Sequence, residues 1–133
     1  MKDKFRPVEI NSVNIINKTF EFSLNLIEFY IFLVRNNEFE FSEKLLKSGT
    51  SIRETIEQSL AADTRYEFLY KISIASKNAI ETRYWLKEIQ MRNIVHSRCD
   101  ECVEKINEII NILSYMTQAS CRTQVHLNIG NLK

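Results

Sequence analysis

The stretch of sequence that decides the fold is Leu45–Leu86, which reads LLKSGTSIRETIEQSLAADTRYEFLYKISIASKNAIETRYWL. Its apolar residues recur every three or four positions on both sides of a very short polar break, a pattern typical of two amphipathic helices joined by a turn. Thr64 and Glu67 have the spacing of a capping box, which starts the second of these helices. We therefore predict helices over about residues 42–61 and 63–91.

The inward faces of these two helices follow from the same spacing. Ser42 is the expected N-cap of the helix over 42–61. Gly49 costs about 1 kcal/mol in helix propensity, so we expect it where a neighbouring helix approaches closely. A phosphate-binding loop would need a glycine-rich run followed by Lys and Ser or Thr, and Gly49 has no such context. The predicted core positions are Leu45, Gly49, Ile52, Ile56, Ser59 and Leu60, then Phe68, Ile72, Ala75, Ala79, Leu86 and Ile89.

The predicted first helix, over about residues 11–36, carries two apolar stripes, more than one bundle core requires. We predict that one stripe faces the core: Val13, Ile16, Phe20, Leu24, Ile27, Ile31 and Val34. The other stripe is then expected to meet another subunit in part: Ile15, Phe22, Leu26, Phe29 and Leu33. The alternative is a central helix that its own partners contact on both sides.

The last part of the chain predicts a fourth helix over 97–120, capped by Ser97, followed by a different pattern. The expected core stripe of this helix is Cys102, Ile106, Ile109, Leu113 and Met116, with Cys99, Val103 and Ile110 beside it. From Thr123 to Ile129 apolar and polar residues alternate, which favours a strand or an extended tail. The expected organisation is an N-terminal arm (1–10), a four-helix bundle (11–120) and a C-terminal tail (121–133).

Composition excludes several functional classes. Lys and Arg number 18 against 17 Asp and Glu, so the net charge of +1 gives no global field for nucleic acid or anionic lipid. The N-terminal MKDKFRPVEI lacks the apolar region of a signal peptide, and no stretch approaches the ~20 apolar residues of a membrane span. Three cysteines, an odd number, favour reduced thiols. We expect a single cytoplasmic domain without a membrane partner.

Four pieces of the chain also occur in the order found in a known family: Leu45–Ile52, Phe68, Lys71–Ala75 and Glu81–Leu86. In these pieces the chain resembles the bacterial 23S ribosomal RNA intervening-sequence proteins. The resemblance implies an all-α, antiparallel up-down-up-down four-helix bundle that assembles as a homo-oligomeric ring, typically a homopentamer. A related branch, the accessory variability proteins of diversity-generating retroelements, binds nucleic acid and a reverse transcriptase. Arg53–Thr55 and Gln58–Ser59 depart from the family pattern, so no functional residue is carried over from there.

The oligomer interface is expected on the two surplus apolar faces. Opposite its core stripe, the third helix carries aromatic and aliphatic residues, including Tyr84, and Tyr and Trp are enriched at interfaces. Stacking against nucleic-acid bases is the competing use of these rings. The predicted interface residues are Phe22, Leu26, Phe29, Tyr66, Tyr70, Ile74 and Trp85.

No catalytic, cofactor or metal site is expected. Cys99 and Cys102, with His96 nearby, have no second Cys/His pair to complete a zinc site, and both cysteines fall on or beside the apolar stripe. A di-iron bundle would need Glu-x-x-His motifs, but Asn93 and Thr123 occupy those positions before His96 and His126. No helix-borne base is expected to face a buried nucleophile. We therefore expect a protein that is not an enzyme.

The basic residues of the predicted third helix are the candidates for binding nucleic acid. Only Arg65, Arg83 and Lys87 come near one line, so a monomer has no basic stripe, whereas a ring would repeat this modest patch. The favoured function is a non-enzymatic oligomeric scaffold or adaptor whose partner is RNA or DNA. The alternative is a protein–protein interaction module that binds no nucleic acid.

Overall fold

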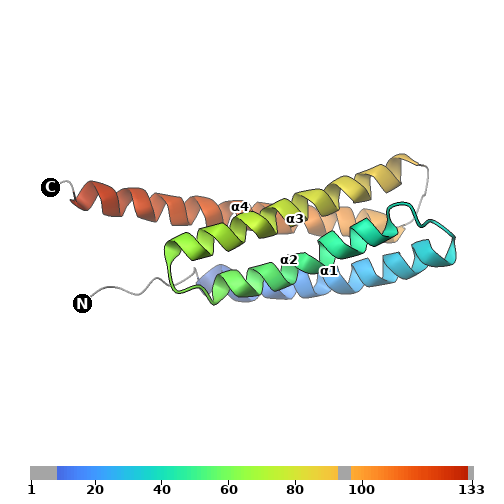
Figure 1. Ribbon diagram of the computed structural model, residues 1–133, viewed down its shortest axis with the longest axis horizontal. Helices are drawn as coiled ribbons and strands as arrows, with labels where there is room; N and C mark the ends of the chain where they lie inside the picture. The colour runs from blue at the N-terminus through green and yellow to red at the C-terminus, as the bar shows by residue number, and fades with distance from the viewer. Residues whose placement is uncertain (1–8, 93–96, 132–133) are drawn as a thin grey trace.

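The computed structural model describes residues 9–92 and 97–131, and all the regular structure in this part of the chain is helical (Figure 1). The helices are α1 (Glu9–Arg35), α2 (Ser42–Leu60), α3 (Arg65–Met91) and α4 (Ser97–Asn131). Each helix contacts two others, in the pairs α1–α2, α2–α3, α3–α4 and α1–α4. This closed cycle of neighbours is the up-down-up-down four-helix bundle expected from the sequence.

The predicted core faces of three helices are confirmed. On α2, α3 and α4 the expected core positions are buried, apart from Leu60 and the two flanking residues Val103 and Ile110, which are half-buried against the core. The start of α3 is also confirmed, because the Thr64 side chain accepts a hydrogen bond from the Glu67 backbone N–H at 3.1 Å. On each of these helices only one apolar stripe is continuous along the helix, so the periodicity indicates directly which side is buried.

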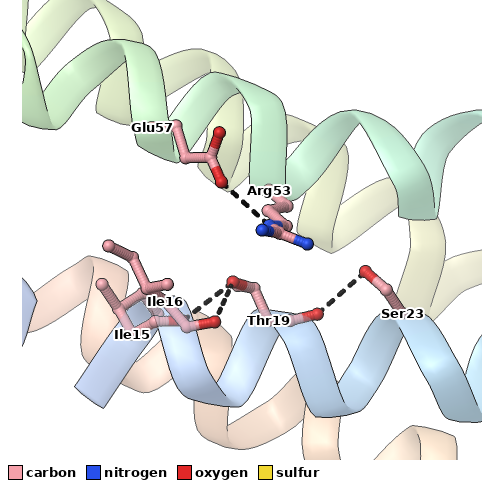
Figure 2. Close-up of polar contacts among 6 residues, drawn as sticks. All are labelled: Ile15, Ile16, Thr19, Ser23, Arg53 and Glu57. Atoms are coloured by element: carbon pink, nitrogen blue, oxygen red, sulfur yellow. Dashed lines mark hydrogen bonds and ion pairs between the residues drawn. The ribbon is translucent and has the colours of Figure 1, made fainter. Parts of the chain in front are cut away.

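The prediction for α1 is wrong, because its two stripes are exchanged. The buried face contains Ile15, Phe22, Leu26, Phe29 and Leu33, whereas Phe20, Leu24, Ile27 and Ile31 are exposed. The buried line continues through Thr19, whose hydroxyl lies 2.9 Å from both the Ile15 and the Ile16 carbonyl oxygens (Figure 2). This local bond satisfies the hydroxyl and allows a polar residue in the core. In the sequence, Thr19 interrupts the inward stripe while the outward stripe is unbroken.

Two further expectations are corrected. Phe41, rather than Ser42, is the N-cap of α2, and the Ser42 hydroxyl donates to the Phe39 carbonyl. The alternating segment after Ser120 is helical, since α4 continues to Asn131 and extends past the ends of the other helices (Figure 1). Extending an existing helix adds one hydrogen bond per residue without a new nucleus, whereas a strand needs a partner for its backbone groups. The N-terminal arm lies largely outside the described residues, and α1 begins at Glu9.

Gly49 lies at a close crossing between helices, as expected. An ideal Cβ atom placed on it would lie 2.0 Å from Leu26 Cδ2 and 3.6 Å from Thr82 Cγ2. Beside it, the buried hydroxyl oxygens of Ser48 and Thr82 are 2.9 Å apart, and Thr82 Oγ1 is 2.7 Å from the Asn78 carbonyl oxygen. The missing side chain therefore lets α2 approach both α1 and α3, and the hydroxyl pair joins α2 to α3.

Gly49→Leu should lower the free energy of unfolding by about 1–3 kcal/mol, because the new side chain overfills this crossing. Gly49→Ala tests whether the close contact with Leu26 is the reason for this loss. The substitution adds helix propensity of up to about 1 kcal/mol, but its methyl group displaces Leu26. In a Leu26→Ala background the displaced atom is absent, so Gly49→Ala should stabilise there and not in the native background. Urea denaturation of the four combinations measures this coupling. Equal stabilisation by Gly49→Ala in both backgrounds would contradict the close crossing.

Candidate interaction surfaces

The two core cysteines have the properties of buried apolar side chains. Burial raises the pKa of Cys99 to about 11 and that of Cys102 to about 12, which keeps both thiols protonated near neutral pH. Cys99 Sγ lies 3.7 Å from the Leu86 carbonyl oxygen. Among the described residues, no three His, Cys, Asp or Glu side chains gather closely enough to hold a metal ion. His96 lies outside the described residues, as does the side chain of His126.

In native protein at mildly alkaline pH, iodoacetamide should modify only Cys121, which is exposed, while Cys99 and Cys102 react after denaturation. The raised pKa values and the burial both slow the modification of Cys99 and Cys102, because the thiolate is the reactive form and must be accessible to the reagent. Mass spectrometry counts the modified thiols before and after unfolding. Rapid native modification of Cys102, or stoichiometric zinc that is lost in Cys99→Ser/Cys102→Ser, would contradict buried core thiols.

The outward face of α1 carries an apolar stripe, which we call the α1 stripe. It consists of Phe20, Leu24, Ile27 and Ile31, whose side chains are each between 41% and 49% exposed. The spacing of four, three and four residues places them on one line along the helix. Four large apolar side chains in a row exceed the scattered single hydrophobic residues of an ordinary surface. This stripe is therefore a candidate interface.

Charged pairs border the α1 stripe and join α1 to α4. Lys18 Nζ lies 2.6 Å from Glu108 Oε2 and Lys105 Nζ lies 3.6 Å from Glu21 Oε2, while Arg98 pairs with Glu28. The hydrogen bond to Glu108 raises the pKa of Lys18, and the same bond lowers the pKa of Glu108. Because each cation has an anionic partner, this border carries no strong charge of either sign.

On its α2 side, the α1 stripe is bordered by Arg53. The Arg53 guanidinium lies 5.2 Å from the Phe20 ring centroid, and its Nε donates to Glu57 at 2.8 Å. Figure 2 shows Arg53 extending from α2 towards α1. Long polar side chains thus cover the edges of the stripe and leave its centre accessible.

The predicted interface residues divide into three groups. Phe22, Leu26 and Phe29 are core residues with at most 1% exposure, so their assignment to an interface was wrong: their apolar partners lie inside the bundle. Tyr66 and Tyr70 are exposed and stacked on each other, with ring centroids 6.5 Å apart. Ile74 and Trp85 are half-buried.

Trp85 lies on the side of α3 that faces α2 and contacts residues from the start of α2. Its ring lies 5.3 Å from that of Phe41 at an interplanar angle of 28°, and Lys44 Nζ lies 4.8 Å from its centroid. Tyr84 meets it edge-on, with centroids 4.9 Å apart. The aromatic face predicted on α3 is thus two surfaces, an exposed tyrosine surface and a tryptophan beside α2.

The predicted nucleic-acid residues lie on one line of α3 but do not form one patch. Arg65 is half-buried at the first residue of α3, and Arg83 lies about 27 Å further along the helix axis, at about 1.5 Å per residue. Arg83 Nη1 donates to Asn107 Oδ1 on α4 at 3.1 Å, and Lys87 is exposed one turn beyond. Only Arg83 and Lys87 are brought together.

Sequence reasoning missed two features of these surfaces. The α1 stripe was visible as an apolar line but was assigned to the core. The proximity of Lys44 to Trp85 has no local sequence signal, because the two residues come from different helices and meet only through the register of α2 against α3. In the described part of the chain, no helix is long and apolar enough to cross a membrane.

The fold defines the class of protein as an antiparallel four-helix bundle, and comparisons identify the family. The chain belongs to the 23S rRNA-intervening sequence protein family, whose model matches residues 11–115. It is similar to a solved structure from Bacteroides thetaiotaomicron described as a protein with unknown function from the S23 ribosomal protein family. The two share 31% sequence identity with a TM-score of 0.76, and the match covers 81% of this chain and 98% of that one. No curated protein matches the chain significantly.

Proposed function

We propose that this protein is a non-enzymatic, self-associating scaffold or adaptor of the cytoplasm, with RNA or DNA as its favoured partner. The observation that carries the proposal is the α1 stripe, an apolar face beyond the needs of the bundle core. Association of such a face with another surface removes apolar area from water. The occupant proposed for it is a second copy of this chain.

The arrangement of surfaces favours a ring. α1 and α3 are not in contact within the described bundle, so they are diagonal and their outward faces point in opposite directions. One carries the α1 stripe and the other carries the exposed tyrosines Tyr66, Tyr70 and Tyr84. Two different surfaces on opposite sides of a subunit allow heterologous contacts, which close into a ring when the rotation permits. The net charge of +1 gives little repulsion between copies. The family resemblance supports a homopentamer.

Light scattering coupled to gel filtration tests the assembly. The 15.7 kDa chain should elute with a mass several times larger at micromolar concentration, five times larger for a homopentamer. A mass that stays at that of one chain over a wide concentration range would refute self-association. The measurement is independent of any ligand, so it judges the scaffold separately from its partner.

A salt titration tests the nucleic-acid partner. A ring would repeat Arg83 and Lys87, with Arg65 further along the same line of α3, and would bind by repeated weak contacts, so affinity should depend on assembly. Counterion release should make the logarithm of the binding constant fall linearly with the logarithm of the salt concentration. The expected slope is about −0.7 to −0.9 per phosphate contacted. Filter binding with several lengths of RNA and DNA measures this slope. If nothing binds at low salt, the protein-interaction module without nucleic acid becomes the better description.

A further inference from the structure

A groove between α2 and α3 combines an aromatic ring, two cations and several hydrogen-bonding groups. Its volume is about 410 Å³, within the range of roughly 300–1,000 Å³ usual for sites that hold one small molecule or one nucleotide-sized group. We call it the α2–α3 groove, and it is lined by Lys44, Lys47, Ser48, Ser51, Asn78, Glu81 and Trp85.

The groove places exposed lysines beside an indole that is packed between other aromatic rings. Phe41 stacks on Trp85 and Tyr84 meets its edge, so the indole is held in place by two aromatic neighbours. Lys44 lies over the same ring at 4.8 Å through an exposed, weak cation–π contact. Its flexible side chain can leave the ring for an anion. Lys47, one turn further along α2, is exposed on the same side.

We propose that the α2–α3 groove binds single-stranded nucleic acid, with an unpaired base stacked against Trp85 and neighbouring phosphates bound by Lys44 and Lys47. This inference rests on the proposed function and adds a contact site to it. Stacking on an aromatic ring beside basic side chains is the arrangement by which proteins bind single strands with little sequence preference. Here the stacking base takes the place of the Lys44 ammonium, which moves to a phosphate.

The remaining groups of the groove favour a nucleotide over an acidic peptide. Glu81 lies within it and accepts a hydrogen bond from the Trp85 indole N–H at 3.5 Å. Its carboxylate repels a phosphate and an acidic side chain alike, but it can also accept a hydrogen bond from the exocyclic amine of a base, a donor that an Asp or Glu side chain lacks. The Asn78 amide can both donate to and accept from a base edge. An acidic peptide would use the two lysines and leave the planar face of Trp85 without a matching partner.

Trp85 is the single tryptophan of the chain, so its fluorescence reports on the groove directly. Titration with an unlabelled single-stranded oligouridylate or oligoadenylate of twelve nucleotides should quench Trp85, whereas a duplex of equal length, whose bases are paired, should not. Filter binding measures the affinity of variants that lack the indole. Trp85→Ala should weaken binding roughly 5- to 150-fold. Trp85→Phe, which keeps an aromatic ring, should retain most of the affinity, and circular dichroism establishes that both variants are folded.

The contribution of Lys44 and Lys47 is measured by removing them and comparing the effect with removal of two cations outside the groove. Lys44→Ala/Lys47→Ala should weaken binding at least tenfold and reduce the salt slope by about 1.4, at about 0.7 per phosphate of a single strand. Arg83→Ala/Lys87→Ala removes the same charge from the other side of α3, where the proposed function also places phosphate contacts. This variant should weaken binding as well, but it should leave the quenching of Trp85 by bound oligonucleotide unchanged, because neither residue lines the groove.

Three results would overturn the inference. If oligonucleotides bind without quenching Trp85 and only Arg83→Ala/Lys87→Ala weakens them, the groove is not the contact site although nucleic-acid binding stands. If poly-glutamate quenches Trp85 and oligonucleotides do not, the groove binds acidic protein segments. If no oligonucleotide binds at low salt, the groove and the nucleic-acid part of the proposed function fail together, while light scattering still decides self-association.

Discussion

Ile27→Glu should convert the assembled protein to monomers while leaving the helical bundle folded. Ile27 lies near the centre of the α1 stripe and is 42% exposed in the single chain, so the monomer tolerates a carboxylate there. In an assembly that buries the stripe, each unpaired carboxylate would cost several kcal/mol, which weakens association by at least ~100-fold. Light scattering measures the loss of mass, and circular dichroism measures the retained helix.

The matched control for this substitution is Tyr115→Glu. Tyr115 is also a large exposed side chain, 54% accessible, but it lies on α4 and outside both proposed contact surfaces. The mass of this variant should stay that of the assembly. Tyr70→Glu, on the exposed tyrosine surface of α3, should dissociate the protein as Ile27→Glu does if that surface is the other half of a heterologous contact. Dissociation by Tyr115→Glu, or none by Ile27→Glu, would argue against the α1 stripe as the interface.

Phe29→Ala should destabilise the bundle by about 3–5 kcal/mol, the usual cost of removing a buried aromatic ring. Phe29 has no exposed surface and packs in the core between the helices. Phe20→Ala removes the same ring from the outward face, where Phe20 is 46% exposed, and should cost much less. The comparison therefore measures which face of α1 is inward.

Urea denaturation in the Ile27→Glu background separates this effect from assembly, because both variants are then compared as monomers. The transition midpoint should fall strongly for Phe29→Ala and little for Phe20→Ala, with similar slopes against denaturant. Equal losses in the two variants would mean that the orientation of α1 described above is incorrect.

The sequence by itself determined the number of helices and the inward faces of three of them. Phe68, Ala75 and Leu86 recur at helical spacing on a helix with one continuous buried face, and such a pattern has one way to bury its apolar residues. Gly49 was also predictable, since a mid-helix glycine is costly unless a neighbour needs the space. The capping pair Thr64 and Glu67 was recognisable because it is entirely local.

The tertiary structure alone decided the orientation of α1, the end of α4 and the composition of the surfaces. Periodicity fixes the phase of an apolar stripe but cannot choose between two stripes on one helix, and the buried Thr19 made the inward one look weaker. The alternation after Ser120 covers too few residues to outweigh the extension of a helix that already exists. Lys44 and Trp85 meet only because α2 packs against α3 in one register. Local sequence determines what each helix can bury, whereas contacts between helices determine which of its faces remains exposed.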